Sequence, residues 1–228
     1  MKRTTVCHCN LGVVRNRLKL AAFIATGTLL SLYSFTPRAS ALGIYTLGPG
    51  QNILANPSAF PVGGTVLDTV IAPFTSSTID GTVISQVISG DSSNPYGGLT
   101  FTYSLSLNNF SSDSSSEMTV GSYGGFVTDV SYNLTDSEVV PSNFTRSTTQ
   151  NGSVIRFMWS NGGGIAPGQQ GALVVVQTAA HNFTSALGGV IDSQTVNIST
   201  LAPVPEPGVA SLLITGLGVF AVWRRQSK

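Results

Sequence analysis

The stretch from Leu99 to Leu107, LTFTYSLSL, alternates strictly between apolar and hydroxyl side chains. Successive side chains of a β-strand point to opposite faces, so this pattern predicts a strand with one buried and one polar face. A similar row at residues 155–159 predicts that Arg156 faces outward and that Trp159 belongs to the core. These rows favour strands that each cover one side of a hydrophobic core.

Further strand candidates surround this stretch. They are residues 129–134, the continuous apolar run 173–176, which favours a central strand, and the weaker rows 83–88 and 190–198. Turn signals separate them at Asn94-Pro95, Gly124-Gly125, Asn151-Gly152, 161–164 and Pro167-Gly168. We expect Asn151-Gly152 to form a tight hairpin turn. Residues 42–202 are therefore predicted to be all-β, an antiparallel β-sandwich (immunoglobulin-like or jelly-roll-like) of about eight to ten strands without a helix of three turns.

Charge is distributed unevenly along the chain. Between Leu42 and Ala202 there are nine acidic side chains, no lysine and only two arginines, Arg146 and Arg156. Such an acidic body lacks the basic surface that neutralises phosphates, which argues against a nucleic-acid partner. Both cysteines, Cys7 and Cys9, precede Leu42, so we expect no disulfide, cysteine metal site or cysteine nucleophile in the body.

Residues 1–41 are typical of a secretory signal peptide. The first 19 residues are basic and contain no acid, an apolar run follows to about residue 35, and Ala39-Ser40-Ala41 ends the segment. Small side chains at Ala39 and Ala41 suit signal peptidase, so we expect cleavage between Ala41 and Leu42. A retained signal anchor is the alternative, although the apolar run is short for a full span.

Residues 203–228 combine three features. Pro205-Glu206-Pro207 interrupts any helix, residues 208–223 are uncharged and mostly apolar, and Arg224-Arg225 lies near the end. The apolar segment would give a transmembrane helix of roughly 24 Å, with the arginines on the inner side of the membrane. The body would then lie on the outer side.

This C-terminal segment resembles the PEP-CTERM sorting signal, with Pro205, Glu206, Pro207, Arg224 and Arg225 at matching positions. The resemblance covers about 25 residues and implies processing near Pro-Glu-Pro by exosortase, a membrane transpeptidase. It implies export across the inner membrane of a Gram-negative-type bacterium, transient anchoring, and release to the cell surface or an exopolysaccharide matrix. A C-terminal anchor that is never processed is the alternative.

Catalytic equipment is sparse in the body. His181 is its only histidine, no Gly-x-Ser-x-Gly occurs, and we predict no catalytic residue, metal site or cofactor. The carboxylates at residues 113–117 and 136–138 leave open a polysaccharide hydrolase, and the oxygens of residues 91–94 leave open calcium. Asn-x-Ser/Thr triplets, a glycosylation hypothesis, begin at Asn109, Asn133, Asn143, Asn151, Asn182 and Asn197.

These observations favour a non-catalytic surface or extracellular-matrix protein that associates with exopolysaccharide in a biofilm. The alternative is a carbohydrate-binding or adhesive module. Its exposed aromatic rings would be Tyr96, Tyr123 and Phe183, which all lie near turn signals.

Overall fold

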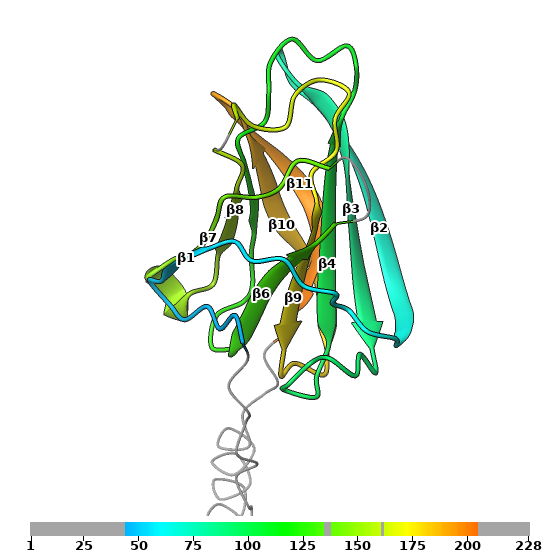
Figure 1. Ribbon diagram of the computed structural model, residues 1–228, viewed down its shortest axis with the longest axis vertical. Coiled ribbons are helices and arrows are strands. Elements are labelled where there is room, and N and C mark those ends of the chain that lie inside the picture. The colour runs from blue at the N-terminus through cyan, green and yellow to red at the C-terminus, as the bar shows by residue number, and fades with distance from the viewer. Residues whose placement is uncertain (1–43, 135–137, 161, 205–228) are drawn as a thin grey trace, which may run out of the picture. The chain divides into compact units, whose positions relative to one another are not determined.

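The computed structural model describes residues 44–134, 138–160 and 162–204. These residues form two antiparallel β-sheets packed face to face (Figure 1). The prediction of an all-β sandwich is confirmed. The predicted signal peptide and C-terminal helix lie outside the described residues.

The first sheet has five strands. In spatial order they are β2 (Thr65–Thr75), β3 (Asp80–Ser89), β4 (Thr100–Leu107), β9 (Leu173–Thr178) and β6 (Thr128–Asn133). The predicted strands at residues 99–107 and 173–176 correspond to β4 and β9, which lie side by side inside this sheet. Val174, Val175 and Val176 are all buried, as expected for a central strand.

The second sheet has six strands. In spatial order they are β1 (Asn52–Leu54), β7 (Asn143–Arg146), β8 (Ile155–Met158), β5 (Glu117–Val120), β10 (Phe183–Ile191) and β11 (Thr195–Pro203). The described residues thus contain eleven strands rather than eight to ten. The weak row at residues 190–198 belongs to two strands, because the β10–β11 hairpin turns between Ile191 and Thr195.

The predicted tight turn at Asn151-Gly152 is wrong. β7 and β8 do pair as an antiparallel hairpin, but residues 147–154 form a longer connection that contains a short 3₁₀ segment, η2 (Thr149–Asn151). The backbone turns through three successive residues with positive φ, namely Gln150 (48°), Asn151 (53°) and Gly152 (75°). A two-residue turn would need only the last two of these.

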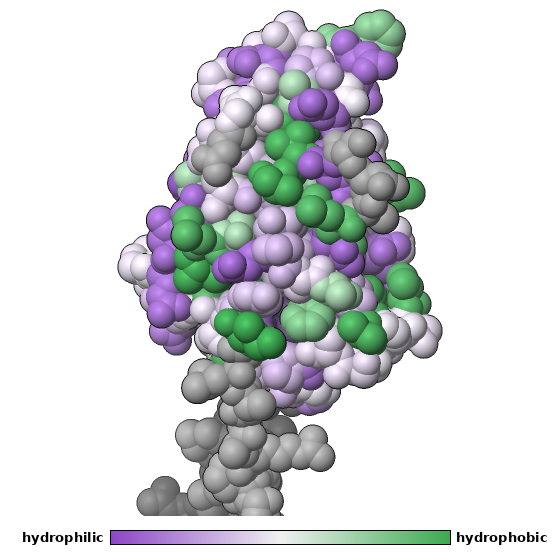
Figure 2. Space-filling view, viewed as in Figure 1, coloured by the Kyte–Doolittle hydropathy of each residue, from purple (hydrophilic) through white to green (hydrophobic). Residues whose placement is uncertain are grey.

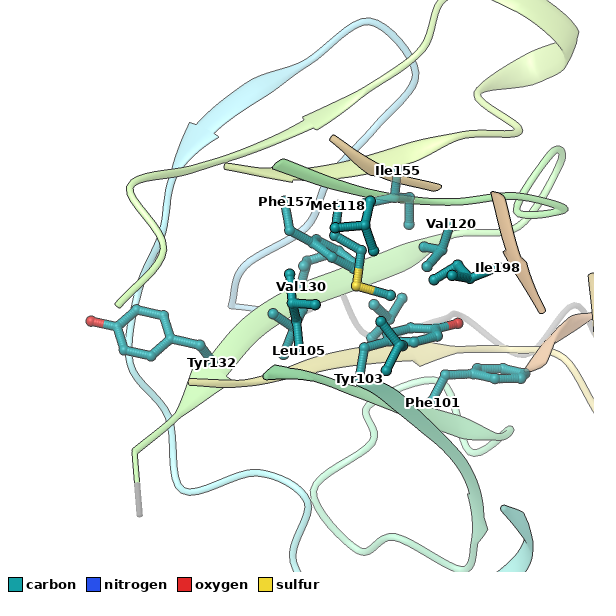
Figure 3. Close-up of a cluster of buried hydrophobic side chains, with 14 of the residues drawn as sticks. Phe101, Tyr103, Leu105, Met118, Val120, Val130, Tyr132, Ile155, Phe157 and Ile198 are labelled. Carbon is teal, nitrogen blue, oxygen red and sulfur yellow. The ribbon is translucent and has the colours of Figure 1, made fainter. Parts of the chain in front are cut away.

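The core lies between the two sheets and is made by alternating inward rows (Figure 3). Phe101, Tyr103 and Leu105 of β4 are almost fully buried against Met118 of β5 and Phe157 of β8. The rings of Tyr103 and Phe157 are 5.7 Å apart, which is within the range of favourable aromatic pairs. Each such side chain contributes roughly 1.5–3 kcal/mol by burial. Trp159 is buried and Arg156 exposed, as predicted.

The outer face of the five-stranded sheet is partly covered, which the alternation of β4 did not predict. Thr100 and Thr102 are buried rather than exposed. The segment that follows β1 crosses this face before it enters β2 (Figure 1). Ser58 Oγ lies 2.8 Å from Ser131 Oγ, and Asn133 Nδ2 donates to the Phe60 carbonyl at 3.1 Å. Polar side chains of the sheet are consequently enclosed beneath a second layer of chain.

The outer edge of β6 is satisfied by the N-terminal segment of the body. Leu47 N donates to Thr128 O at 2.9 Å, and Val130 N donates to Tyr45 O at 3.1 Å. Farther along, Tyr132 N donates to the carbonyl of Asn56 at 3.1 Å. Between these contacts the chain pairs β1 with β7 of the other sheet. Residues 45–58 therefore close one side of the sandwich.

The edge strands β11 and β2 are protected differently. In β11, Leu201 N donates to Ser85 Oγ at 2.9 Å, and its carbonyl accepts from Tyr103 Oη at 2.7 Å. In β2, a register irregularity between Val66 and Asp68 and the imide nitrogen of Pro73 interrupt the edge. A bulge, a charge and a proline are devices that discourage pairing with another strand.

Candidate functional site

A hollow of about 270 Å³ lies on the outer face of the five-stranded sheet. Ile84 and Leu173 form the apolar part of its wall, and the polar lining residues are Gln86, Thr102, Ser104, Glu138 and Gln170. Gln170 Nε2 donates to Ser104 Oγ at 3.1 Å and to Glu138 Oε1 at 3.4 Å. Figure 2 shows apolar side chains in several groups among polar ones on the side of the molecule that it displays. Hydrogen-bonding groups beside apolar surface are the combination that ligand pockets use.

The three predicted ligand aromatics have different surroundings. Tyr96 is half-buried, with its hydroxyl 3.3 Å from Thr46 Oγ1, and Phe183 is half-buried against the core. Tyr123 is fully buried, and its ring packs edge-on against Phe101 with the centroids 5.8 Å apart. The expectation of an exposed ring is therefore wrong for Tyr123, because a residue beside a turn can still point into the core.

Tyr123 instead belongs to a buried hydroxyl pair. Its hydroxyl lies 2.6 Å from that of Tyr103, which itself donates to Leu201 O. Since Tyr103 has one hydroxyl hydrogen, Tyr123 is the donor to Tyr103. Burial raises the pKa of both phenols well above the ordinary value, so both remain neutral and link the two sheets.

The carboxylates of the two predicted clusters, residues 113–117 and 136–138, have different surroundings. Asp113 is exposed and accepts from Ser114 N at 2.7 Å, whereas Glu117 Oε2 lies 3.4 Å from Arg156 Nε. Glu138 lines the hollow, and Asp136 lies outside the described residues. His181, the only histidine of the body, is exposed at the surface.

Asp91, predicted as a calcium candidate, is the acceptor of a buried network. Its Oδ1 accepts from Val62 N and Ser93 N, both at 2.9 Å, and from Ser93 Oγ. Its Oδ2 accepts from Thr100 Oγ1 at 2.7 Å and Gln177 Nε2 at 2.9 Å. Burial acts to raise the pKa of Asp91, but these hydrogen bonds outweigh burial and hold the pKa below its ordinary value. The carboxylate thus fastens the loop after β3 to the sheet.

Asn94 completes this fastening. Its Nδ2 lies within hydrogen-bonding distance of the carbonyls of Gly98 and Thr178, at 3.0 and 3.1 Å, and its Oδ1 accepts from Tyr96 N. Across the described ranges, no group of three or more His, Cys, Asp or Glu side chains is placed to hold a metal ion.

Asp129 is a second buried carboxyl on the same face, and it has fewer donors. It lies directly opposite Gln177 in the pairing of β6 with β9. Burial raises the pKa of Asp129 and outweighs the backbone hydrogen bonds from Tyr45, Ile44 and Val130, which act to lower the pKa. Within the described part of the chain, neither Asp129 Oδ1 nor Gln177 Oε1 has a hydrogen-bond partner. The pair therefore contains two buried acceptor oxygens without a donor.

Arg146 is the buried cation of the body. Its Nε donates to Gly152 O at 2.7 Å. The remaining donations go to Leu47 O, Thr128 Oγ1, Tyr123 O and Phe126 O, at 2.6 to 3.0 Å. All these acceptors are neutral, and burial lowers the pKa of Arg146. The guanidinium joins four segments at the end of the sandwich where the body begins.

The sequence analysis missed Arg146, Asp129 and Gln177. For Arg146 the alternation of side chains along the strand offered a signal, because Phe144 and Arg146 share one face of a short strand and Phe144 is apolar. The same alternation along β6 places Asp129 on the outer face of the sheet and Val130 on the inner face. Burial of that outer face arises from distant segments, which alternation within a strand does not reveal.

No helix in residues 44–134, 138–160 and 162–204 has the length and hydropathy needed to cross a membrane.

Comparison of the chain with known protein families, with curated proteins and with solved structures gave no match.

Proposed function

We propose that this protein is an exported bacterial surface or extracellular-matrix protein, processed by signal peptidase and exosortase, whose body is non-catalytic and associates with exopolysaccharide. The observation that supports this proposal is the order of the sequence signals that precede and follow one sandwich. A leader-like segment precedes Ile44, and the Pro205-Glu206-Pro207 segment with its basic end follows Val204. The finer description of the body as immunoglobulin-like or jelly-roll-like is part of the same proposal.

The arrangement of the body supports delivery from a single membrane-side end. The described part of the chain starts and ends at the lower end of the sandwich in Figure 1. A chain that enters and leaves at one end can be tethered there while the opposite loops project outward. Asp91 and Arg146, two ionisable side chains of the interior, also have structural partners.

The intact mass of the protein isolated from its native cell surface tests this proposal. A chain that starts at Leu42 and ends near Pro205–Pro207 is the expected result. A mass that includes Trp223 and Lys228 would contradict exosortase processing and favour a permanently anchored protein. A mass that includes residues before Leu42 would contradict removal of the leader.

The second candidate is carbohydrate binding at the hollow beside Ile84 and Leu173. Its volume is slightly below the roughly 300–1,000 Å³ of ligand pockets, so a short segment of a glycan chain fits better than a long one. The side-chain amides of Gln86 and Gln170 would supply hydrogen bonds to sugar hydroxyls. Tyr96 and Phe183 are retained as alternative contacts.

Retention on the polysaccharide made by the native host measures this second candidate. We expect Gln86→Ala together with Gln170→Ala to reduce retention at least about tenfold, the effect of losing roughly 1.4 kcal/mol of binding energy. Gln194→Ala, at the exposed β10–β11 turn, is the matched control and should retain binding. Equal retention by all variants would place carbohydrate binding elsewhere.

A further inference from the structure

The hollow on the outer face of the five-stranded sheet contains a single ionisable group. Among its lining residues only Glu138 has an ionisable side chain, and the others are polar or aliphatic. Glu138 and Gln86 are half-buried, whereas Gln170 is exposed. A ligand in the hollow would therefore meet one carboxylate beside neutral hydrogen-bonding groups.

Backbone contacts hold the segment that carries Glu138. Val139 N donates to Gln170 O at 2.9 Å. The Val139 carbonyl accepts from Ala172 N at 2.9 Å and from Trp159 Nε1 at 3.1 Å. The side chain of Gln170 also donates to Glu138 Oε1 at 3.4 Å. The backbone beside Glu138 is thus fixed before a ligand arrives, and such preorganisation lowers the entropy cost of binding.

An aliphatic strip lies next to the polar lining. Ile84 of β3 lines the hollow, and Ile71 of β2 is its direct partner in the antiparallel register. Cross-strand partners lie on the same face of a sheet, so the two side chains form one apolar strip, with 38% of Ile84 and 65% of Ile71 exposed. Gln86, two residues farther along β3, donates to Thr69 Oγ1 at 3.3 Å. Apolar surface edged by amides suits the C–H face and the hydroxyl groups of a sugar ring.

Within the described ranges, no cationic side chain lines the hollow. Arg146 is buried and donates to backbone carbonyls, and Arg156 lies on β8 of the other sheet. His181 lies beyond the end of β9 that is remote from Leu173, the residue of β9 that lines the hollow. Residues 42–202 also contain nine acidic side chains against two arginines and no lysine. An acidic sugar would consequently enter a negative surface without a positive partner.

The sign of the charge at Glu138 distinguishes between classes of sugar. Charges interact more strongly where protein displaces water, because the effective dielectric constant is lower there. A uronate beside Glu138 would be repelled, whereas a protonated amino group would add the attraction of an ion pair to its hydrogen bond. A hydroxyl or N-acetyl group offers the hydrogen bond alone.

We propose that the hollow binds a short glycan segment that carries an unacetylated amino sugar, whose ammonium group pairs with the Glu138 carboxylate, and that it rejects segments with uronate groups. This inference rests on the second candidate function, carbohydrate binding at the hollow, and names the class of sugar that the hollow selects. The aliphatic strip of Ile71 and Ile84 supports the ring, and Gln86 and Gln170 bind its hydroxyl groups.

The test measures retention of the full chain and its variants, produced in the native host, on beads that carry oligosaccharides of equal length. The three probes are glucosamine oligomers, the same oligomers with every amino group acetylated, and galacturonate oligomers. Acetylation removes the positive charge and keeps the sugar ring, so it isolates the contribution of the ion pair. Glu138→Gln removes the carboxylate of the hollow. Asp113→Asn is the matched control, because it removes one exposed acidic charge from a residue that does not line the hollow.

We expect glucosamine oligomers to bind at least about tenfold more tightly than the acetylated ones, and galacturonate oligomers not to be retained. Glu138→Gln should abolish this preference by weakening the binding of glucosamine oligomers alone, and Asp113→Asn should preserve it. Equal losses in the two variants would show a general attraction of a polycation to an acidic protein and would overturn the assignment of Glu138.

Other outcomes separate this inference from the second candidate function. Equal binding of the charged and the acetylated oligomers, lost in the double variant Gln86→Ala and Gln170→Ala, would overturn the selection of an amino sugar and leave carbohydrate binding at the hollow in place. The same conclusion holds if none of the oligomers binds while retention on the host polysaccharide depends on the two glutamines. Retention that no variant of the hollow alters, on the oligomers and on the host polysaccharide, would overturn both.

Discussion

Asp91 and Asp129 lie on opposite sides of Gln177 on the same sheet face, and both are more than nine-tenths buried. Asp91 receives donors from four residues, and its pKa is lowered. Asp129 keeps one oxygen without a partner, and its pKa is raised. Both carboxyls are buried, so the supply of hydrogen-bond donors accounts for the difference between their pKa values.

The two sites also differ in where their donors originate. Asp91 is enclosed by its own loop and by neighbouring strands. Asp129 receives backbone donors from Ile44 and Tyr45, in the segment that begins the body, and from Val130 on its own strand. The comparison therefore links the pKa of each buried carboxyl to the donors that the fold brings to it.

The largest effect is expected at Arg146, the cation that closes the same end of the sandwich. Arg146→Met would remove the guanidinium donors from the carbonyls of Leu47, Tyr123, Phe126 and Gly152. Leu47 O would keep Thr128 Oγ1 and Tyr123 O would keep Phe126 N, so, within the described residues, the carbonyls of Phe126 and Gly152 are the ones left without a donor. We expect a loss of at least about 3 kcal/mol in the free energy of unfolding, because unsatisfied buried groups cost about 1–3 kcal/mol each. Urea unfolding measures this loss. Unchanged stability would show that these carbonyls find water instead.

Asp91→Asn tests the carboxyl that receives hydrogen bonds from four residues. The amide cannot accept all the donors of Val62, Ser93, Thr100 and Gln177, so we expect a loss of about 2–4 kcal/mol by urea unfolding. Asp68→Asn is the matched control on the exposed edge strand β2 and should change stability by less than about 0.5 kcal/mol. Similar losses for the two variants would contradict the special role of Asp91.

The pH dependence of stability should have opposite signs at the two carboxyls. The lowered pKa of Asp91 gives stability that is present above about pH 4 and is lost as pH falls through the folded-state pKa. The raised pKa of Asp129 gives stability that is present below about pH 4 and is lost as pH rises through the folded-state pKa.

The midpoint of urea unfolding, measured between pH 3 and pH 8, would show both the loss of stability at acid pH and the loss at higher pH. Asp91→Asn should remove the loss of stability at acid pH, and Asp129→Asn should remove the loss at higher pH. If either substitution leaves the profile unchanged, the assignment of that loss is wrong.

The smallest effect is expected at Arg156, the other arginine of the body. Its pairing with Glu117 is partly exposed, with 48% of the Arg156 side chain accessible, so solvent screens the attraction. Arg156→Ala should cost no more than about 1 kcal/mol. Thermal unfolding at low and high salt measures the change. A loss comparable to that of Arg146→Met would contradict the contrast between the buried and the exposed cation.

The sequence predicted those parts of the fold that depend on alternation within one strand. β4 and β8 have the inward rows expected from Phe101, Tyr103 and Phe157, and Trp159 is buried directly after β8. Strand β2 was not predicted, because Pro73 and Asp68 interrupt its apolar pattern, and both belong to an edge. The hairpin of β10 and β11 was only partly recognised, since Gly188 and Gly189 remove apolar side chains from its middle.

The buried polar groups could not be predicted for a different reason. Thr100 and Gln177 look like solvent-facing residues of ordinary strands, and only the chain that crosses the sheet makes them interior. Tyr123 adjoins a turn signal, yet its hydroxyl reaches Tyr103 in the core. These features depend on contacts between residues far apart in the sequence, which periodicity does not encode.

The carboxyl ¹³C chemical shifts of Asp91 and Asp129, followed with pH by NMR, test the contrast between the two carboxyls most directly. The pKa of Asp91 should lie below the ordinary aspartate value, and the pKa of Asp129 should lie above it. Identical titrations of the two carboxyls would contradict the account in which the supply of hydrogen-bond donors sets their difference.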